Sequence, residues 1–532
     1  MSFAKEQVNH RFRIPDWLLL AAVCAFFFLW RLAAFGLIGA DEPRYAQVAR
    51  AMLETGDWVT PRLGGEAWLE KPPLYYWQAL PCYRLFGVHD WAARLPSVAD
   101  ATILVFAVYY FLRRFHPGSA LAGALMLAST AAMVGYARAA SMDMALSAAF
   151  ALAMLAWYSW LRGGNRGLLL GFYGLIGLAM LAKGPVAAFL AVVMISLFAA
   201  VERNLKIVRD SLSLSGILLF LVVGMPWYVL VQLRNPQFFR VFVLEHNLAR
   251  FGTNMFHHPQ PIWYYLPVTL LGWLPSTIFV ALALVWGVRQ FKAGHRERGL
   301  DRFLVIWILV VVLFFSLSQS KLPGYILPAI PAGILLLASY LENRSFQRAG
   351  PVLIVLEGLI TTSLVFAALL LPYLVREHRF SWGAIAIPPL LVASLAGVLV
   401  SLFLLRMGLD GLRLVTVLPA VLTVAITLRI GAPALEETLS ARSVSDSLSR
   451  LSPDRLPVAV VLVPREIEFG LEFYRNQAIR RYEFGQVPSG EHLVVARQGV
   501  RDAFARDISG RRLLYLGNFP PQKLEFFYVS AR

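Results

Sequence analysis

Long apolar runs recur along most of this 532-residue chain and set what it can fold into. A helix needs about 20 mainly apolar residues to cross a bilayer core, and helix is the form in which one segment bonds all its own backbone groups in lipid. With 58% hydrophobic and only 15% charged residues, the composition excludes an ordinary soluble protein. The sequence therefore predicts a mostly α polytopic membrane bundle. Thirteen runs of this kind lie at 17–36, 93–112, 118–136, 143–161, 167–182, 185–201, 212–233, 263–287, 303–319, 323–341, 351–374, 383–405 and 411–430.

Basic residues gather between alternate runs, on the side of the basic N-terminus. Arg113 with Arg114, and the cluster across 289–302, are examples. Such clusters mark the cytoplasmic side and contacts to anionic lipid, so the net charge of +17 is no indication of a nucleic acid partner. An odd number of spans then predicts a cytoplasmic N-terminus and an outward C-terminus, together with an outward loop at 37–94.

The chain divides by composition near residue 430. Residues 1–430 hold the apolar runs, and the loop 37–94 carries two helical patterns that we expect to lie at the membrane interface. Residues 431–532 lose the long apolar runs. Short β-like runs there alternate with helical patterns at 466–476 and 500–507. The β-like runs lie at 457–463, 492–496, 512–516 and 524–529. We expect a small soluble α/β domain there.

The first outer loop concentrates ionisable residues. Asp41, Glu42 and Arg44 stand together at the start of the first helical pattern, and Glu70 with Lys71 precedes two prolines. Capping a helix N-terminus would explain one acid. Two acids, an arginine and a Glu-Lys pair are the groups that handle a phosphate and a proton at one site, so we interpret the loop as catalytic.

Further charged residues stand at the outer ends of other spans. Lys183 and Lys321 lie at Gly-Pro and Pro-Gly breaks, and Asp143 begins the fourth span. Lysines at a membrane face can be anchors, and an acid at a helix start can be a cap. A phosphate-bearing lipid substrate explains the lysines better, because ammonium groups neutralise its charge. An ionisable residue at membrane depth is itself a candidate for function.

The loop 234–262 contains a candidate metal ligand. His246 lies there near Arg250, and with Glu70 it would suit a divalent ion such as Zn, Mg or Mn, although spacing alone cannot show this. No phosphate-binding P-loop, dinucleotide fingerprint or HExxH motif occurs in a suitable context, so we expect no nucleotide cofactor.

Several strings together resemble a known superfamily. They are ADEPRYAQVARAMLETGDWVTPRLGGEAWLEKPPLYYW, RAASMDMAL, LEHNLARF, HHPQPIWYY and SQSKLPGYILPAIP. In these strings the chain is similar to the membrane glycosyltransferases of the protein mannosyltransferase and lipid A aminoarabinose transferase superfamily. The resemblance implies a GT-C type fold in the bacterial inner membrane with the site facing the periplasm.

The resemblance also assigns roles. Asp41 matches the first-loop catalytic acid and Asp143 a second acid near it. Arg44 and Lys71 match groups that face the carrier phosphate, Lys321 and Tyr325 match cavity residues next to the lipid, and Glu70 with His246 matches a divalent metal site. To the catalytic set we add Glu42, and to the phosphate set Lys183 and Arg250.

The predicted function is inverting transfer of a sugar, aminoarabinose or another pentose or hexose, from a polyprenyl-phosphate carrier to lipid A, another glycolipid or a protein. A flippase for lipid-linked sugars is the alternative, but it would need polar residues along the spans, and here the ionisable side chains gather on one face. A membrane scaffold without catalysis would leave that set of side chains unexplained.

Overall fold

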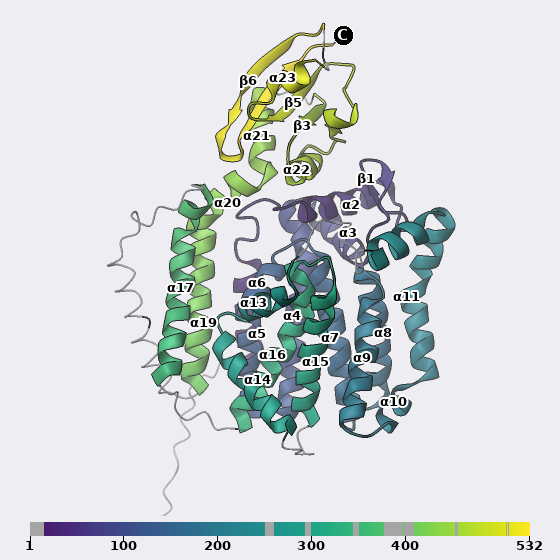
Figure 1. Cartoon of the computed structure of the whole chain (residues 1–532), viewed down its shortest axis with the longest axis vertical. Coiled ribbons are helices and arrows are strands. Elements are labelled where there is room, and N and C mark those ends of the chain that lie inside the picture. Colours follow the sequence, from purple (N-terminus) through teal and green to yellow (C-terminus); the bar gives the residue numbers. More distant parts are fainter. Residues whose placement is uncertain are drawn as a thin grey trace, which may run out of the picture.

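A computed structural model describes residues 15–249, 260–292, 299–343, 351–376, 409–452, 456–506 and 510–531, with residues 397 and 508. It is a helical bundle with a small sheet domain at one end (Figure 1). The helices of the first half are α1 (Asp16–Cys24), α2 (Asp41–Thr55), α3 (Leu74–Phe86), α4 (Asp90–Phe115), α5 (Ala120–Ser129), α6 (Ala131–Ala137), α7 (Met142–Leu161), α8 (Arg166–Lys183), α9 (Val186–Val201), α10 (Lys206–Ser211) and α11 (Leu214–Arg234).

The second half continues the bundle and adds the sheet. Its helices are the π-helical η3 (Phe239–Ala249), α13 (Tyr265–Gly272), α14 (Thr277–Lys292), α15 (Gly299–Leu317), the 3-10 helix η6 (Pro323–Ala329), α16 (Ile330–Asn343), α17 (Pro351–Arg376), α19 (Leu409–Ile426), α20 (Ala432–Leu439), α21 (Ala441–Leu451), α22 (Arg465–Arg475) and α23 (Arg501–Ala505). The strands are β1 (Arg62–Leu63), β2 (Glu66–Ala67), β3 (Val458–Val461), β4 (Arg480–Arg481), β5 (His492–Arg497), β6 (Leu513–Phe519) and β7 (Leu524–Val529).

The mostly helical membrane fold is confirmed. Within the described residues, eight helices are long and apolar enough to span a membrane, or ten if two bent pairs each count as one span. Every predicted run falls on a helix except 383–405, of which the structure describes residue 397 alone. The count of thirteen remains a prediction, because α1 and α9 belong to shorter apolar helices and the run 263–287 is broken by a turn of 118° between α13 and α14.

Aromatic side chains build much of the bundle core. Trp157, Trp273 and Trp307 are buried, and each indole N–H donates a hydrogen bond, to Ser211 Oγ and to the carbonyls of Ile330 and Pro328 respectively. A buried tryptophan needs such a partner for its N–H. The core is thus apolar without leaving these donors unsatisfied.

The C-terminal domain carries a five-stranded sheet of order β4-β3-β5-β7-β6. β3 pairs in parallel with β4 and β5, and β7 pairs antiparallel with β5 and β6. The predicted runs at β3, β5, β6 and β7 are confirmed as strands, and α22 is confirmed as a helix. The last apolar helical segment runs on to Leu439, beyond the predicted boundary at 430, and that boundary stays a prediction.

The sheet domain and the first loop lie at the same end of the bundle (Figure 1). α2 begins at Asp41 and ends before Gly56, which takes the left-handed conformation that suits a helix end. We expected α2 to lie on the membrane surface, but it packs between α3 and α22 and buries residues on several sides. Because α22 covers α2, part of the apolar surface of α2 is buried against protein.

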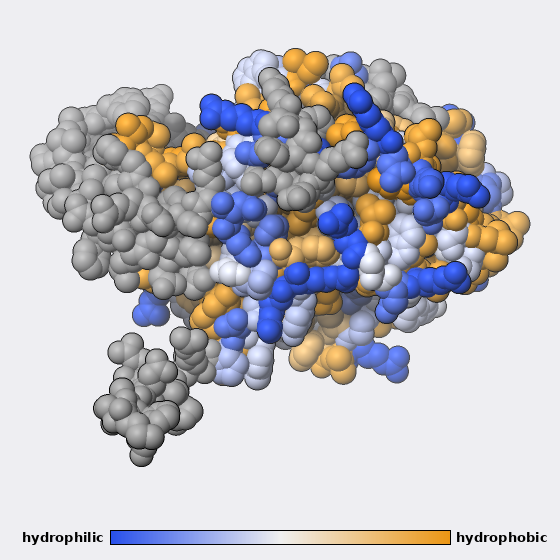
Figure 2. Space-filling view, turned by 90° about the horizontal axis from the view of Figure 1, so that it is seen from below, coloured by the Kyte–Doolittle hydropathy of each residue, from blue (hydrophilic) through white to orange (hydrophobic). Residues whose placement is uncertain are grey.

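The opposite end carries α10 and many hydrophilic side chains set among apolar ones (Figure 2). Arg114 lies at this end, where its guanidinium donates to the carbonyl of Arg162. The prediction of basic loops facing one side is consistent with this distribution.

Candidate functional site

Asp41 and Arg44 form an ion pair at the start of α2. The Asp41 side chain is 54% exposed, whereas that of Arg44 is only 13% exposed. The Arg44 guanidinium lies over the rings of Trp68 at 4.9 Å and Phe469 at 5.5 Å. Burial acts to lower the pKa of Arg44, but neighbouring groups that include Tyr45, Asp41 and Glu70 raise it above its usual value. The first turn of α2 thus presents an accessible carboxylate held by a charged arginine.

Asp143 and Lys183 form a second ion pair, between the start of α7 and the end of α8. Both side chains are less than one fifth exposed. Ser141 caps α7 by accepting from the backbone N–H of Asp143, and its hydroxyl also donates to the Asp143 carboxylate at 3.0 Å. The Lys183 ammonium lies 4.5 Å from the centre of the Tyr325 ring, which brings η6 into the site. An acid at one helix start and a cation at another helix end suit both helix dipoles.

The two ion pairs belong to one electrostatic neighbourhood. The charges of Asp41 and Asp143 both act on the buried hydroxyl of Tyr45. Burial is the main cause that raises the pKa of Tyr45, and the two carboxylates add to it. Lys71 adds positive potential at Asp143, and Glu70 adds negative potential at Arg44. The structure therefore brings six predicted site residues on α2, α7, α8 and the first loop to one place, together with a seventh, Tyr325.

Glu42 points elsewhere. Its carboxylate accepts from Arg94 Nη2 at 2.8 Å and from the backbone N–H groups of Ile38 at 2.9 Å and Ala140 at 2.8 Å. Both oxygens are engaged, and the residue is buried. These contacts show that Glu42 stabilises the fold at the start of α2. Its catalytic role stays a prediction, and its hydrogen bonds do not support that role.

The Lys321 ammonium is engaged within its own turn. The residue is buried, and its ammonium donates to the carbonyl of Ser318 in its own turn. The predicted phosphate contact of Arg250 lies outside the described residues. His246 falls within η3, but its side chain is likewise outside what the structure describes.

No three His, Cys, Asp or Glu side chains in the described ranges are grouped so that they could hold a metal ion. Glu70 is described, and its predicted partner is the undescribed His246 side chain. The metal pair therefore stays a prediction, and no chemical step below depends on it.

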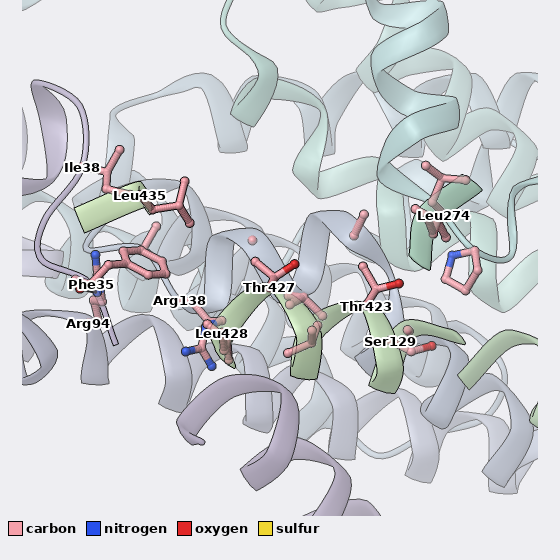
Figure 3. A pocket seen from close by; sticks show the side chains of 18 of the residues that line it. Phe35, Ile38, Arg94, Ser129, Arg138, Leu274, Thr423, Thr427, Leu428 and Leu435 are labelled. Atoms are coloured by element: carbon pink, nitrogen blue, oxygen red, sulfur yellow. Dashed lines mark hydrogen bonds between the residues drawn. The ribbon is translucent and has the colours of Figure 1, made fainter. Parts of the chain in front are cut away.

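A mostly apolar cavity of about 520 Å³ is lined in part by the segment that leads into α2 (Figure 3). Phe35, Ile38 and Arg94 line one end, and Thr423 and Leu274 line the other. Residues of α6, of α19 and of the turn between α13 and α14 line it. An apolar cavity with few polar groups suits a lipid chain.

Arg138 in the wall of this cavity holds the end of the first helical segment. Its guanidinium donates to the carbonyls of Phe27 and Trp30 at 3.1 Å and of Arg31 at 3.0 Å. Arg138 lies five residues before Asp143 in the chain, but its guanidinium binds the end of the first helical segment instead. Unpaired carbonyls at helix ends need such donors.

Comparison with known proteins gives the family. Residues 70–229 match the family described as dolichyl-phosphate-mannose-protein mannosyltransferase. The undecaprenyl phosphate-alpha-4-amino-4-deoxy-L-arabinose arabinosyl transferase of Pseudomonas paraeruginosa is 33% identical over 365 residues, covering 67% of this chain and 65% of that protein. The chain belongs to the protein mannosyltransferase and aminoarabinose transferase superfamily.

Other members extend the similarity. A protein of the same name from Aeromonas hydrophila is 31% identical over 347 residues, covering 63% of this chain and 62% of its own length. The match thus spans just under two thirds of these superfamily members. The crystal structure of ArnT from Cupriavidus metallidurans bound to undecaprenyl phosphate has a TM-score of 0.79 at 22% identity, and the match covers 96% of this chain and 97% of that one. The fold of that protein is therefore shared along nearly the whole chain.

Two features of the site escaped the sequence reasoning. Trp68 and Phe469 flank Arg44, and Phe469 comes from the distant α22. Trp68 lies in a segment already singled out, so its proximity to the ionisable residues was a usable signal. No local sequence pattern around Phe469 could have predicted that its ring packs against Arg44 of α2.

Proposed function

We propose that the chain transfers a sugar from a polyprenyl-phosphate carrier to an acceptor at the end of the bundle that carries α2 and the sheet domain. The observation that supports this best is the pairing of Asp41 with Arg44 and of Asp143 with Lys183 in one neighbourhood, with Lys71 close by. A cation that is paired with a carboxylate can release it and bind a phosphate instead, because the phosphate also presents oxygen acceptors and carries more negative charge.

In the proposed reaction, the acceptor hydroxyl attacks the anomeric carbon of the donor sugar. A carbon–oxygen bond forms as the bond from that carbon to the carrier phosphate breaks, and the bonding electrons leave with the lipid phosphate. This single displacement inverts the anomeric configuration. The proton goes to the exposed Asp41 carboxylate, which acts as general base. If the acceptor is itself a phosphate, no base is required, and Asp41 would help to position the substrate or bind a metal ion.

Negative charge grows on the leaving phosphate during this step. Arg44, Lys71 and Lys183 would stabilise that charge more in the transition state than in the ground state. Asp143 would hold Lys183 in place through the ion pair until the phosphate arrives. Tyr325 supports the same ammonium from the other side by its ring face.

Donor and acceptor are proposed by class. The relatives' printed name makes 4-amino-4-deoxy-L-arabinose on undecaprenyl phosphate the first donor to test. Lipid A, another glycolipid or a protein is the proposed acceptor. If the metal pair of Glu70 and His246 exists, a divalent ion would add positive charge near the phosphate. We place the protein in a bacterial inner membrane, with the N-terminus cytoplasmic and the sheet domain periplasmic, on the basic-loop distribution.

The test is turnover by the purified full-length protein. Undecaprenyl-phosphate aminoarabinose and lipid A are supplied in detergent, and mass spectrometry follows release of free undecaprenyl phosphate. Asp41→Asn and Lys71→Ala are each expected to lower turnover by about a hundredfold or more. Asp446→Asn, at an exposed position of α21, is the matched control and is expected to retain wild-type turnover.

Two results would contradict the assignment. If both site variants kept near-normal turnover, the residues would have the wrong roles. If the folded wild type left every lipid-linked donor intact yet moved it between leaflets of a vesicle, the flippase would replace the transferase.

A further inference from the structure

A polar crevice of about 540 Å³ lies between the first outer loop and the sheet domain. The tip of the β1–β2 hairpin, at Leu63 and Gly64, forms one wall. α22 forms the second wall, and the segment 478–486, which includes β4, forms the third. The walls come from parts of the chain about 400 residues apart, yet a hydrogen bond from Gly64 N–H to Glu472 Oε1 at 2.9 Å joins them across 408 positions. The crevice is thus a built feature of the folded protein.

The side chains in the crevice combine donors, acceptors and rings. Glu468 and Glu472 offer carboxyl oxygens, Arg480 and Arg481 offer guanidinium donors, and Gln486 offers an amide. Two rings, Phe469 and Phe484, complete the lining, and Phe484 is 68% exposed. Two acidic and two basic side chains line it together, so the crevice is not a purely cationic site for an anion.

This combination fits one class of ligand. Sugar hydroxyls both donate and accept hydrogen bonds, so they need acceptors and donors side by side. Sugar rings also present apolar C–H faces, which pack against aromatic rings. The charged side chains make the crevice unsuitable for a lipid chain. The two carboxyl groups disfavour a phosphate group bound alone.

The charged groups in the crevice are already arranged. Arg481 Nε lies 3.4 Å from Glu468 Oε2, and its guanidinium lies 5.4 Å from the centre of the Phe484 ring. Arg480 is exposed on the edge strand β4 and lines the same space. Burial raises the pKa of Glu472 to about 7, so near neutral pH this carboxyl exists in both forms and can either donate to or accept from a hydroxyl.

The crevice adjoins the proposed catalytic acid. Phe469 lines the crevice and also lies against the Arg44 guanidinium, which pairs with Asp41. One side chain therefore separates a group bound in the crevice from the Asp41–Arg44 pair. An acceptor whose hydroxyl reaches Asp41 would have the rest of its polar head beside Phe469.

We propose that this crevice binds the saccharide head group of a glycolipid acceptor, so that the hairpin and the sheet domain together determine which acceptor is used. The proposal rests on the proposed transferase function and deepens it. It assigns to the sheet domain a direct role in substrate selection. Phe484 and Arg480 are the specificity residues, and neither is assigned to the chemical step.

The kinetic test uses Arg480→Ala and Phe484→Ala in the full-length protein. At saturating undecaprenyl-phosphate aminoarabinose, each is expected to raise the KM for lipid A about tenfold, the effect of losing one charged hydrogen bond or one ring contact. The KM for the donor and the kcat are expected to stay at wild-type values. Arg497→Ala at the end of β5 and Leu514→Ala on β6 are the matched controls, since both positions are exposed and outside the crevice.

A binding test without turnover separates this proposal from the proposed function. Hydrogen–deuterium exchange of α22 and β4 is measured with and without an acyl-free glucosamine disaccharide, in its plain and phosphorylated forms. Protection by either form in the wild type, lost in Phe484→Ala, is expected. If a disaccharide protects these segments of the wild type but the wild type transfers no sugar, the proposed transferase function is wrong. The proposed binding site would still be supported.

Three outcomes overturn the crevice proposal. One is transfer to lipid A with the same acceptor KM in both crevice variants as in both controls. Another is the absence of protection at α22 and β4 by either disaccharide. The last is turnover confined to a peptide acceptor, which would assign the crevice to protein rather than to glycolipid.

Discussion

Loss of Arg94 should damage the fold of the first outer loop without removing a proposed substrate contact. Arg94 is 1% exposed and makes five hydrogen bonds. Two reach the Glu42 carboxylate, and three reach the carbonyls of Leu32, Phe35 and Gly36 at 2.8–3.1 Å. These carbonyls lie in the segment that leads into Asp41, so Arg94 fixes the entry to α2.

We expect Arg94→Met to lower the free energy of unfolding by about 3–5 kcal/mol. Removing one partner of a buried ion pair leaves the other charge buried and unpaired, which costs that much. Three carbonyls also lose their donor, so the upper part of this range is the more appropriate estimate. Glu42 keeps its two backbone donors, which limits the damage.

The assay is thermal unfolding of the purified protein in detergent, followed by intrinsic tryptophan fluorescence. The matched control is Arg240→Met, which breaks the exposed pair of Arg240 with Glu245 and is expected to cost about 0–1 kcal/mol. Glu42→Gln, alone and combined with Arg94→Met, completes a double-mutant cycle. If Arg94→Met melted at the same temperature as Arg240→Met, the framework role of the buried pair would be wrong.

Three further predictions concern the site and the sheet domain. Burial raises the pKa of Glu472 to about 7, so the folded state binds a proton more tightly than the unfolded state. The free energy of unfolding should therefore fall as the pH rises from about 4.5 to 7. Glu472→Gln should make this pH dependence weaker in melting curves. Gly324→Ala should lower turnover by about tenfold or more, because its Cβ would lie 2.8 Å from the Asp143 carboxyl carbon, whereas Gly135→Ala, with open space around its Cβ, should melt and turn over like wild type. His246→Ala should weaken zinc binding in a titration of chelator-treated protein; unchanged binding would refute the metal pair.

Much of the fold could be read from the sequence because apolar run length is a strong local signal. The helix α2 (Asp41–Thr55) and the strands β5 and β7 depend on local patterns and are confirmed. Gly272, Pro275 and Ser276 mark a break in the run 263–287, but such residues do not give its angle, so the 118° turn after α13 was not predicted. Apolar composition reports burial in lipid but carries no direction.

The candidate site was predictable in composition and less so in arrangement. The clustering of Asp41, Arg44, Glu70 and Lys71 within one loop was visible in the sequence. The separation of Glu42 from its neighbour Asp41 was not, because it depends on Arg94 meeting the carboxylate from another helix. Adjacent residues at a helix start point to different sides, and only tertiary contacts decide which side holds the substrate.

The joining of the first loop to α22 has a consequence for how the protein is made. Gly64 bonds Glu472, and Glu54 accepts from Asn476, across gaps of 408 and 422 residues. At roughly 5–20 residues per second, the ribosome takes about 20–80 s to synthesise the partner after the loop has emerged. During that interval the loop lacks its cover, and Arg44 lacks the Phe469 ring. A chain cut short before α22 would therefore insert its helices but leave the loop unfinished.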